Sequence, residues 1–201
     1  MQIGKRAMLL AAAAFALALL AGCHGLEAKP AMFIETAKLS EKEERLAELL
    51  GAKQGLYDFL VDDAVDHMSV NVYRLSAEGQ WERYSGGGIF AISKSGRLAI
   101  QFERLENGIT VGIQSDGETG RSSYHLAEAK EETPPEMARI TTSLSGVCEI
   151  VYEQEVPIAL QIETAQDAVS GDLSWFETPE RFVQEGIESV YVVTVTFSKQ
   201  T

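Results

Sequence analysis

Short runs in which apolar and polar side chains alternate dominate the chain from residue 57 to residue 197. The clearest runs are residues 68–72, 98–102, 109–113, 156–162 and 191–197. Strict alternation is typical of strands that turn one face to a core and the other to solvent. Glycine-containing pairs separate the runs and favour tight turns, with Asn107-Gly108 the clearest and Asp116-Gly117 another. The pattern predicts a mainly β protein with roughly nine to eleven strands in an antiparallel β-sandwich, or alternatively a barrel.

One short helix is expected before the strands. Ser40 and Glu43 have the spacing of a capping box, and Gly51 can end the helix. Leu46, Leu49 and Leu50 form an apolar stripe at helical spacing between these signals.

Two later segments break the alternation. Residues 128–136 are charged and include Pro134-Pro135, which indicates a solvated loop. Residues 178–186 begin with Thr178-Pro179 and end with a glycine, so a second short helix is expected there.

The N-terminus has the layout of a secretory signal peptide. Lys5 and Arg6 precede an apolar run over residues 8–20, which is shorter than the roughly 20 residues that span a bilayer. Leu20-Ala21-Gly22-Cys23 follows and closely resembles the bacterial lipobox. The resemblance implies cleavage between Gly22 and Cys23, a diacylglycerol on the Cys23 thiol and an acyl chain such as palmitate on the new N-terminus.

This interpretation divides the chain into three parts. Residues 1–22 are a lipoprotein signal peptide, residues 23–38 a lipidated tether, and residues 39–201 a helix followed by a single β-rich domain. Two alternatives remain open. The segment could be an ordinary secretory signal with a coincidental cysteine, or an uncleaved anchor.

The charge of the chain limits the partners that it can bind. The 30 acidic residues outnumber the 17 basic ones, which gives a net charge of −13. Removal of Lys5 and Arg6 with the signal peptide changes this to 15 − 30 = −15. Such a surface repels nucleic acids and anionic headgroups, so we expect no nucleic-acid partner and attachment to the membrane through lipid alone.

The expected location is the extracytoplasmic face of the cell membrane. An outer membrane is the alternative, because the tether lacks a Ser/Gly-rich stalk and His24 follows the lipidated cysteine. Lipidation of Cys23 leaves Cys148 as the only thiol, which excludes an internal disulfide. Cys148 lies in an apolar run and is expected in the core, although a reactive thiol is the alternative.

No metal or cofactor is expected from the pattern of ligating residues. The three histidines (His24, His67 and His125) have no zinc-site spacing. The densest carboxylate cluster does not follow the spacing of a calcium loop; it comprises Asp58, Asp62, Asp63 and Asp66.

No catalytic residue is predicted either. The chain has no G-x-S-x-G, and the glycines at 86–88 lack the frame of a phosphate-binding loop, so a bulge or bend is expected there. A glycoside hydrolase would need a pair of carboxylates. The candidate carboxylates are dispersed along the chain, and the sequence does not single out two of them as a catalytic pair. They are Glu103, Glu106, Glu149, Glu153 and Glu155.

Aromatic side chains are the remaining candidates for ligand contact. Trp175 and Phe176 follow a turn-like segment, and together with Trp81 they could form a ligand platform. Packing in a core is the more common use of such residues.

The chain also resembles a set of uncharacterised exported β-rich proteins of Gram-positive gut bacteria. The resemblance is carried by residues 57–63, 70–75, 95–100 and 190–197, and by Trp81. It implies a cell envelope with one membrane and supplies no catalytic residue.

These observations favour a lipid-anchored, non-catalytic binding or scaffolding module with a protein or glycan partner. A hydrolase of wall or dietary glycans with dispersed carboxylates is one alternative. An accessory subunit of an envelope complex is another.

Overall fold

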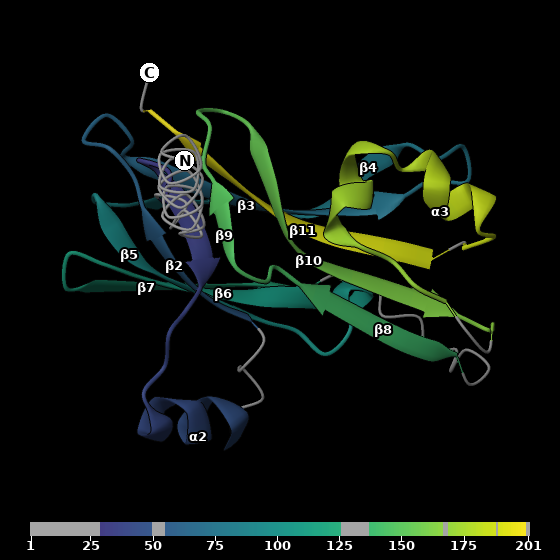
Figure 1. Ribbon diagram of the computed structural model, residues 1–201, viewed down its shortest axis with the longest axis horizontal. Helices are drawn as coiled ribbons and strands as arrows, with labels where there is room; N and C mark the ends of the chain where they lie inside the picture. Colours follow the sequence, from purple (N-terminus) through teal and green to yellow (C-terminus); the bar gives the residue numbers. More distant parts are fainter. Residues whose placement is uncertain (1–28, 50–54, 126–136, 167–168, 188, 200–201) are drawn as a thin grey trace, which may run out of the picture.

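Two antiparallel β-sheets form the body of the protein (Figure 1). The computed structural model describes residues 29–49, 55–125, 137–166, 169–187 and 189–199. The first sheet has the strand order β7 (Glu118–His125), β6 (Gly108–Ser115), β5 (Ser95–Gln101), β2 (Leu56–Leu60), β1 (Phe33–Thr36) and β9 (Val147–Glu149). The second has the order β4 (Trp81–Ala91), β3 (His67–Leu75), β11 (Ser189–Ser198), β10 (Glu155–Thr164) and β8 (Ala138–Ser143).

Four short helical segments accompany the strands in the described part of the chain. They are α2 (Glu41–Leu49), η2 (Leu105–Asn107), η3 (Leu173–Glu177) and α3 (Glu180–Gln184). Within the described residues, no helix is both long enough and apolar enough to cross a bilayer. The predicted signal peptide, Cys23 and the loop at 128–136 lie outside the described residues.

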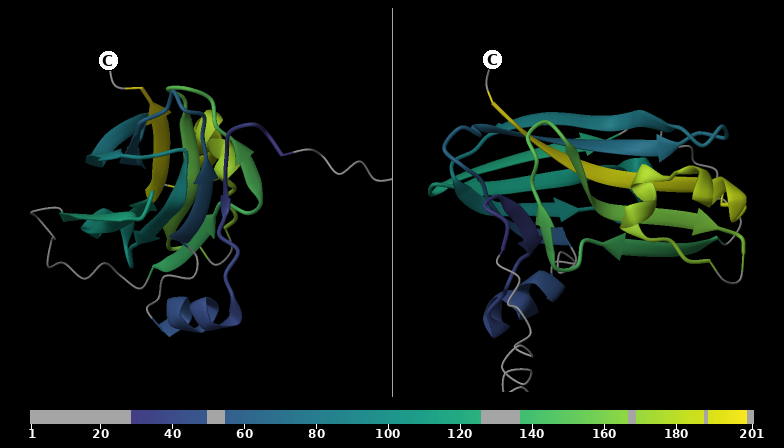
Figure 2. Two further views of the ribbon diagram at one scale, coloured as in Figure 1. Left: turned by 90° about the vertical axis from the view of Figure 1, so that its left-hand side faces the viewer. Right: turned by 45° about the horizontal axis from the view of Figure 1, so that its top comes forward.

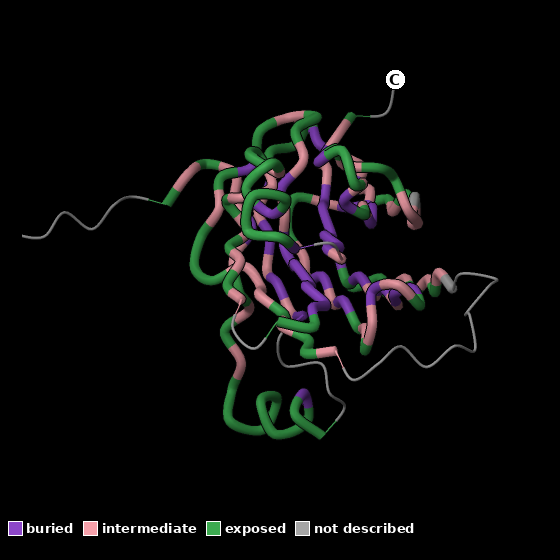
Figure 3. Tube along the Cα trace, turned by 90° about the vertical axis from the view of Figure 1, so that its right-hand side faces the viewer, coloured by how far each residue is buried: buried purple, intermediate pink, exposed green. Residues whose placement is uncertain are grey.

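A main core fills the space between the two sheets, which confirms the predicted β-sandwich. Its largest side chains come from both sheets and include Tyr57, Phe59, Leu98, Met68 and Phe197, all of them buried. The sheets keep separate edges in the described chain, so a closed barrel is not formed. Buried residues accordingly run along the strands where the two layers face each other (Figure 3).

A second, smaller core covers part of the outer face of the five-stranded sheet. Helical segments η3 and α3 lie against this face (Figure 2). Phe182 of α3 is fully buried there against Leu160 and Ile162 of β10. The sheet is therefore buried on both sides at one end and on one side at the other.

A β-bulge in β10 allows one strand to serve both cores. Its pairing with β11 shifts between Pro157 and Ala159. Val156 and Ile158 consequently face the main core, whereas Leu160 and Ile162 face the second core. The even alternation of this run predicted a single face for all four side chains, and that prediction was wrong because the extra residue of a bulge reverses the alternation.

The glycine run at 86–88 also forms a bulge, as predicted. The pairing of β4 with β3 shifts here, with Val70 opposite Gly88 and Asn71 opposite Gly86. Gly86 has a φ of 94°, and a Cβ at Gly88 would lie 1.7 Å from the Tyr124 hydroxyl. Glycine is thus required both for the backbone conformation and for the close approach of β7.

The helix α2 begins as predicted but packs differently. The Ser40 backbone N–H donates to a Glu43 carboxylate oxygen at 2.8 Å, as in a capping box. Leu46 and Leu49 are 56% and 82% exposed, so these two residues of the predicted apolar stripe are not buried in a core. Ala47 is the buried residue of this helix, and Leu50 and Gly51 lie outside the described residues.

The segment assigned to the tether contains a strand of the sandwich. Residues Phe33–Thr36 form β1, which pairs with β2 on one side and with β9 on the other. Ile34 is fully buried in the main core. The sandwich therefore includes residues 33–36, which lie inside the range of 23–38 predicted for a tether.

The two clearest turn signals have different outcomes. Asp116 and Gly117 both have positive φ and connect β6 to β7 in a two-residue turn. Asn107 instead ends the η2 helix, and Gly108 begins β6 with a φ of 107°. Strands β5 and β6 do pair, but across a longer connection than the Asn-Gly pair suggested.

Candidate functional site

The three predicted platform residues lie over the second core. Trp81 stacks on Phe176 with ring centroids 5.5 Å apart, and its Nε1–H donates to the Phe176 carbonyl at 2.8 Å. Trp175 packs on the Phe182 ring at 5.1 Å, and the Arg181 guanidinium lies 4.2 Å above its ring. All three are half-buried and hold η3 and α3 against the sheet.

A polar network continues from these rings onto the uncovered part of the same face. Tyr73 of β3 links the two, because its ring lies 6.4 Å from that of Phe176 and its hydroxyl donates to Glu155 Oε1 at 2.6 Å. We call this set of side chains the Tyr73 network; it consists of Asn71, Tyr73, Arg83, Glu155 and Thr194.

The strand pairing brings the members of the Tyr73 network together from four strands. Asn71 of β3 lies opposite Thr194 of β11, and Tyr73 lies opposite Arg83 of β4. Glu155 begins β10 and pairs with the neighbouring part of β11. Cross-strand neighbours on one face lie about 5 Å apart, within reach of direct hydrogen bonds.

Three donors converge on a single oxygen of Glu155. Besides the Tyr73 hydroxyl, the Thr194 hydroxyl donates to Oε1 at 3.2 Å and the Asn71 amide at 3.4 Å. Arg83 donates to the Asn71 amide oxygen at 2.5 Å, which orients that amide. The hydrogen bonds within the described residues thus fix the carboxylate through Oε1 and leave Oε2 for another donor.

The electrostatics of the network favour a protonated Tyr73. Burial raises the pKa of Tyr73 to about 12, with further contributions from the hydrogen bond and the charge of Glu155. The hydroxyl therefore remains a donor over the physiological pH range. The exposed Arg83 adds guanidinium donors beside the carboxylate.

Glu163, a second carboxylate of β10, is buried and paired with two arginines, which the sequence did not indicate. Glu163 is 4% exposed and accepts from Arg104 at 3.0 Å and from Arg139 at 2.9 Å. Gln161, on the same face, accepts from the Leu105 backbone N–H at 2.8 Å. Both side chains connect β10 to the η2 segment of the other sheet, so this cluster joins the two layers.

The other candidate carboxylates lie apart from the Tyr73 network. Glu106 pairs with Arg104, and Glu149 lies in β9. Glu153 lies in the turn before β10 with a φ of 59°, and the backbone carbonyl of Glu103 accepts from Gln161. The network itself holds one carboxylate, Glu155, whereas hydrolysis of a glycoside requires two.

The acidic residues of the β2–β3 region have separate partners. Asp58 pairs with Arg97, Asp62 accepts from Tyr152, Asp63 pairs with Lys94, and Asp66 contacts His67. In the described part of the chain, no three His, Cys, Asp or Glu side chains gather closely enough to hold a metal ion.

Cys148 packs half-buried against the main core in β9. Burial, together with the charge of Glu149, raises the pKa of its thiol, which disfavours the reactive thiolate.

Comparison of the chain with known protein families, curated proteins and solved structures finds no match.

Proposed function

We propose that this protein is a lipid-anchored extracytoplasmic binding module that binds a glycan at the Tyr73 network. In this proposal Cys23 carries the lipid and is the membrane attachment, and the sandwich presents the binding face. The lipobox residues Leu20-Ala21-Gly22-Cys23 support the anchor. The observation that carries the binding function is the convergence of three donors on one oxygen of Glu155 beside a half-buried aromatic cluster.

The chemistry of the network suits a polyhydroxylated ligand. The fixed carboxylate can accept from a sugar hydroxyl through Oε2, and Arg83 can donate to a neighbouring oxygen. Tyr73 and Phe176 add half-buried rings at the edge of the network. A few oriented polar groups next to apolar rings are typical of sites that bind small ligands.

The anchor is tested by replacing each cysteine separately. The wild-type protein should incorporate labelled palmitate and partition into the detergent phase, and Cys23→Ser should lose both properties. Cys148→Ser is the matched control and should retain both. A Cys23→Ser protein that still takes up label would disprove lipidation at this residue.

The binding function is tested with the detergent-solubilised full-length protein on immobilised glycans. The panel comprises peptidoglycan fragments, teichoic acids and plant polysaccharides. One member should be retained, and Glu155→Gln or Arg83→Gln should weaken its binding about ten-fold. Glu153→Gln, in the neighbouring turn, is the control. Retention of none of these glycans, or equal binding by Glu155→Gln, would contradict the proposal.

A further inference from the structure

A cleft of about 440 Å³ lies on the side of the sandwich where β4 and β7, the edge strands of the two sheets, approach each other. We propose that this cleft docks an extended segment of a partner protein in which an apolar side chain stands next to a lysine or arginine. The proposal is independent of the Tyr73 network, and three features of the cleft support it.

The first feature is a short stretch of unpaired strand edge. β4 is the last strand of its sheet, so one side of its backbone has no neighbouring strand in the described structure. The bulge at 86–88 interrupts the regular pattern of this edge on one side of the cleft. On the other side, the Ser93 N–H donates to Ser115 Oγ. The Ile92 N–H points the other way, toward β3, and donates to the Asp66 carbonyl.

Residues 89–91 therefore remain as a regular edge between the bulge and Ser93. A strand edge presents a row of backbone donors and acceptors that an extended peptide can pair with. The length of the free edge limits the pairing to about three residues, which suits a short segment rather than a whole added strand.

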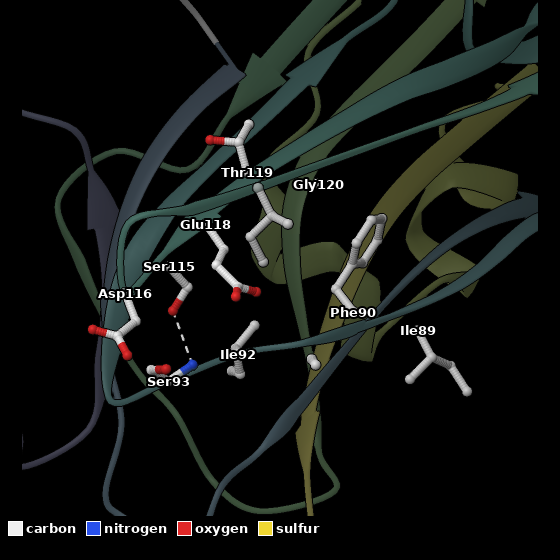
Figure 4. Close-up of a pocket in the computed structure, with 11 residues that line it drawn as sticks. Ile89, Phe90, Ile92, Ser93, Ser115, Asp116, Glu118, Thr119 and Gly120 are labelled. Carbon is white, nitrogen blue, oxygen red and sulfur yellow. Dashed lines mark hydrogen bonds between the residues drawn. The ribbon is translucent and has the colours of Figure 1, made fainter.

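The second feature is an apolar surface at the cleft. Phe90 and Ile92 line the cleft (Figure 4), the first half-buried and the second buried, and the buried Ile113 also contributes to its lining. Ile89, which also lines the cleft, is 70% exposed. An apolar side chain of the partner can cover the exposed surface of Ile89 and Phe90, and removal of this surface from water favours binding.

The third feature is the sign of the charge. Asp116 and Glu118 are the charged residues that line the cleft, and neither has an ion-pair partner among the described residues. In Figure 4 the Glu118 carboxylate projects into the space between Ser115 and the Phe90 ring. The chain as a whole carries a net charge of −13. A cationic side chain complements this cleft, whereas an acidic partner is repelled.

The test is a selection of phage-displayed random 12-residue peptides against the detergent-solubilised full-length protein. We expect enriched peptides to share an apolar residue beside a lysine or arginine. A synthetic peptide of that pattern should bind at least ten-fold more weakly to Glu118→Lys than to the wild type. Glu180→Lys changes the charge equally on α3 and should leave its affinity unchanged.

Amide hydrogen exchange identifies the site directly. Bound peptide should slow exchange at residues 89–91, and the pattern elsewhere shows whether each variant is folded. Glu155→Gln should leave peptide affinity unchanged, which separates this proposal from the glycan site. The proposal is overturned if the enriched peptides share no such pattern, if Glu118→Lys binds as well as the wild type, or if the protection falls outside the cleft.

Discussion

Glu155 and Glu163 lie at opposite ends of one strand and show two uses of a carboxylate in this fold. The bulge at Pro157 and Ala159 places them on opposite faces of the sheet. Glu163 is buried between the layers and is neutralised by Arg104 and Arg139. Glu155 faces outward and is held by neutral donors that use one of its oxygens.

The difference in partners explains the difference in role. A buried carboxylate needs cations as well as hydrogen bonds to offset its desolvation. Of the two cations here, Arg139 lies in the neighbouring strand of the same sheet and Arg104 links Glu163 to the other sheet. A half-buried carboxylate oriented by hydroxyls and an amide through one oxygen leaves its second oxygen for another donor. The first arrangement stabilises the fold, and the second is available to a ligand.

The largest effect is expected for Glu163→Gln. The substitution removes the carboxylate that accepts from Arg104 and Arg139, although Arg104 keeps its pair with Glu106, so the free energy of unfolding should fall by about 3 kcal/mol. Urea denaturation followed by circular dichroism measures it. The exposed turn variant Glu153→Gln should change stability by less than about 0.5 kcal/mol. A cost for Glu163→Gln no greater than that of Glu155→Gln would remove the distinction between the two sites.

A smaller effect is expected at high pH from Tyr57, which bonds to the middle of the same strand. Its hydroxyl donates to the Ile158 carbonyl at the bulge, and burial raises its pKa to about 12, above the ordinary value of 10.0. Because the folded state holds this proton more tightly, its contribution to stability is complete below pH 10. That contribution is lost as the pH rises towards 12.

The slope of stability against pH measures this contribution. One tyrosine accounts for up to about 1.4 kcal/mol per pH unit between pH 10 and 12. Tyr57→Phe should reduce the slope by about that amount, as measured by urea denaturation at several pH values. Tyr191 also has a pKa raised to about 12 by burial, so some slope should remain. An unchanged slope in Tyr57→Phe would show that Tyr57 ionises equally in both states.

Glu155→Gln should lower the pKa of Tyr73 but have little effect on the free energy of unfolding. The carboxylate helps to raise the pKa of Tyr73, so its neutralisation should lower that pKa, whereas Tyr191 should titrate as before. The loss in stability should be about 1 kcal/mol or less, because an amide oxygen can still accept the Tyr73 hydroxyl. NMR titration of labelled tyrosine rings resolves the two residues. A simultaneous shift at Tyr191 would indicate a change in the fold rather than a local effect.

The smallest effect on global stability is expected for Ser40→Ala, far from β10. Loss of the cap should destabilise α2 by about 1 kcal/mol. Because α2 buries little beyond Ala47, faster amide exchange at residues 41–49 should occur without a change in the urea midpoint. A lower midpoint would mean that α2 contributes to the cooperative unit.

The sequence predicted the β-sandwich, the hairpin turn at Asp116 and the capping box at Ser40, because each depends on residues close together in the chain. It did not reveal the bulge in β10, since an uninterrupted alternation over residues 156–162 hides a change of face. It also assigned residues 33–36 to a tether, because four residues are too few for a clear period.

The Tyr73 network and the ion pairs of Glu163 were not predicted, because their members come from segments far apart in the chain. Trp81 and Phe176 were selected as aromatic residues, yet their partner Tyr73 and the carboxylate of Glu155 come from other strands. The pairs of Glu163 with Arg104 and Arg139 likewise join different strands and the η2 connection. Such contacts follow from strand order and register, which local periodicity does not specify.

The position of β1 has a consequence for the order in which the protein folds. This strand lies near the start of the chain, but its second neighbour, β9, is synthesised only after seven other strands. During folding, β1 can pair with β2 early, and its other edge must wait for the distant segment that contains Cys148. Completion of the sheet is thus a late, long-range event, of the kind that slows folding.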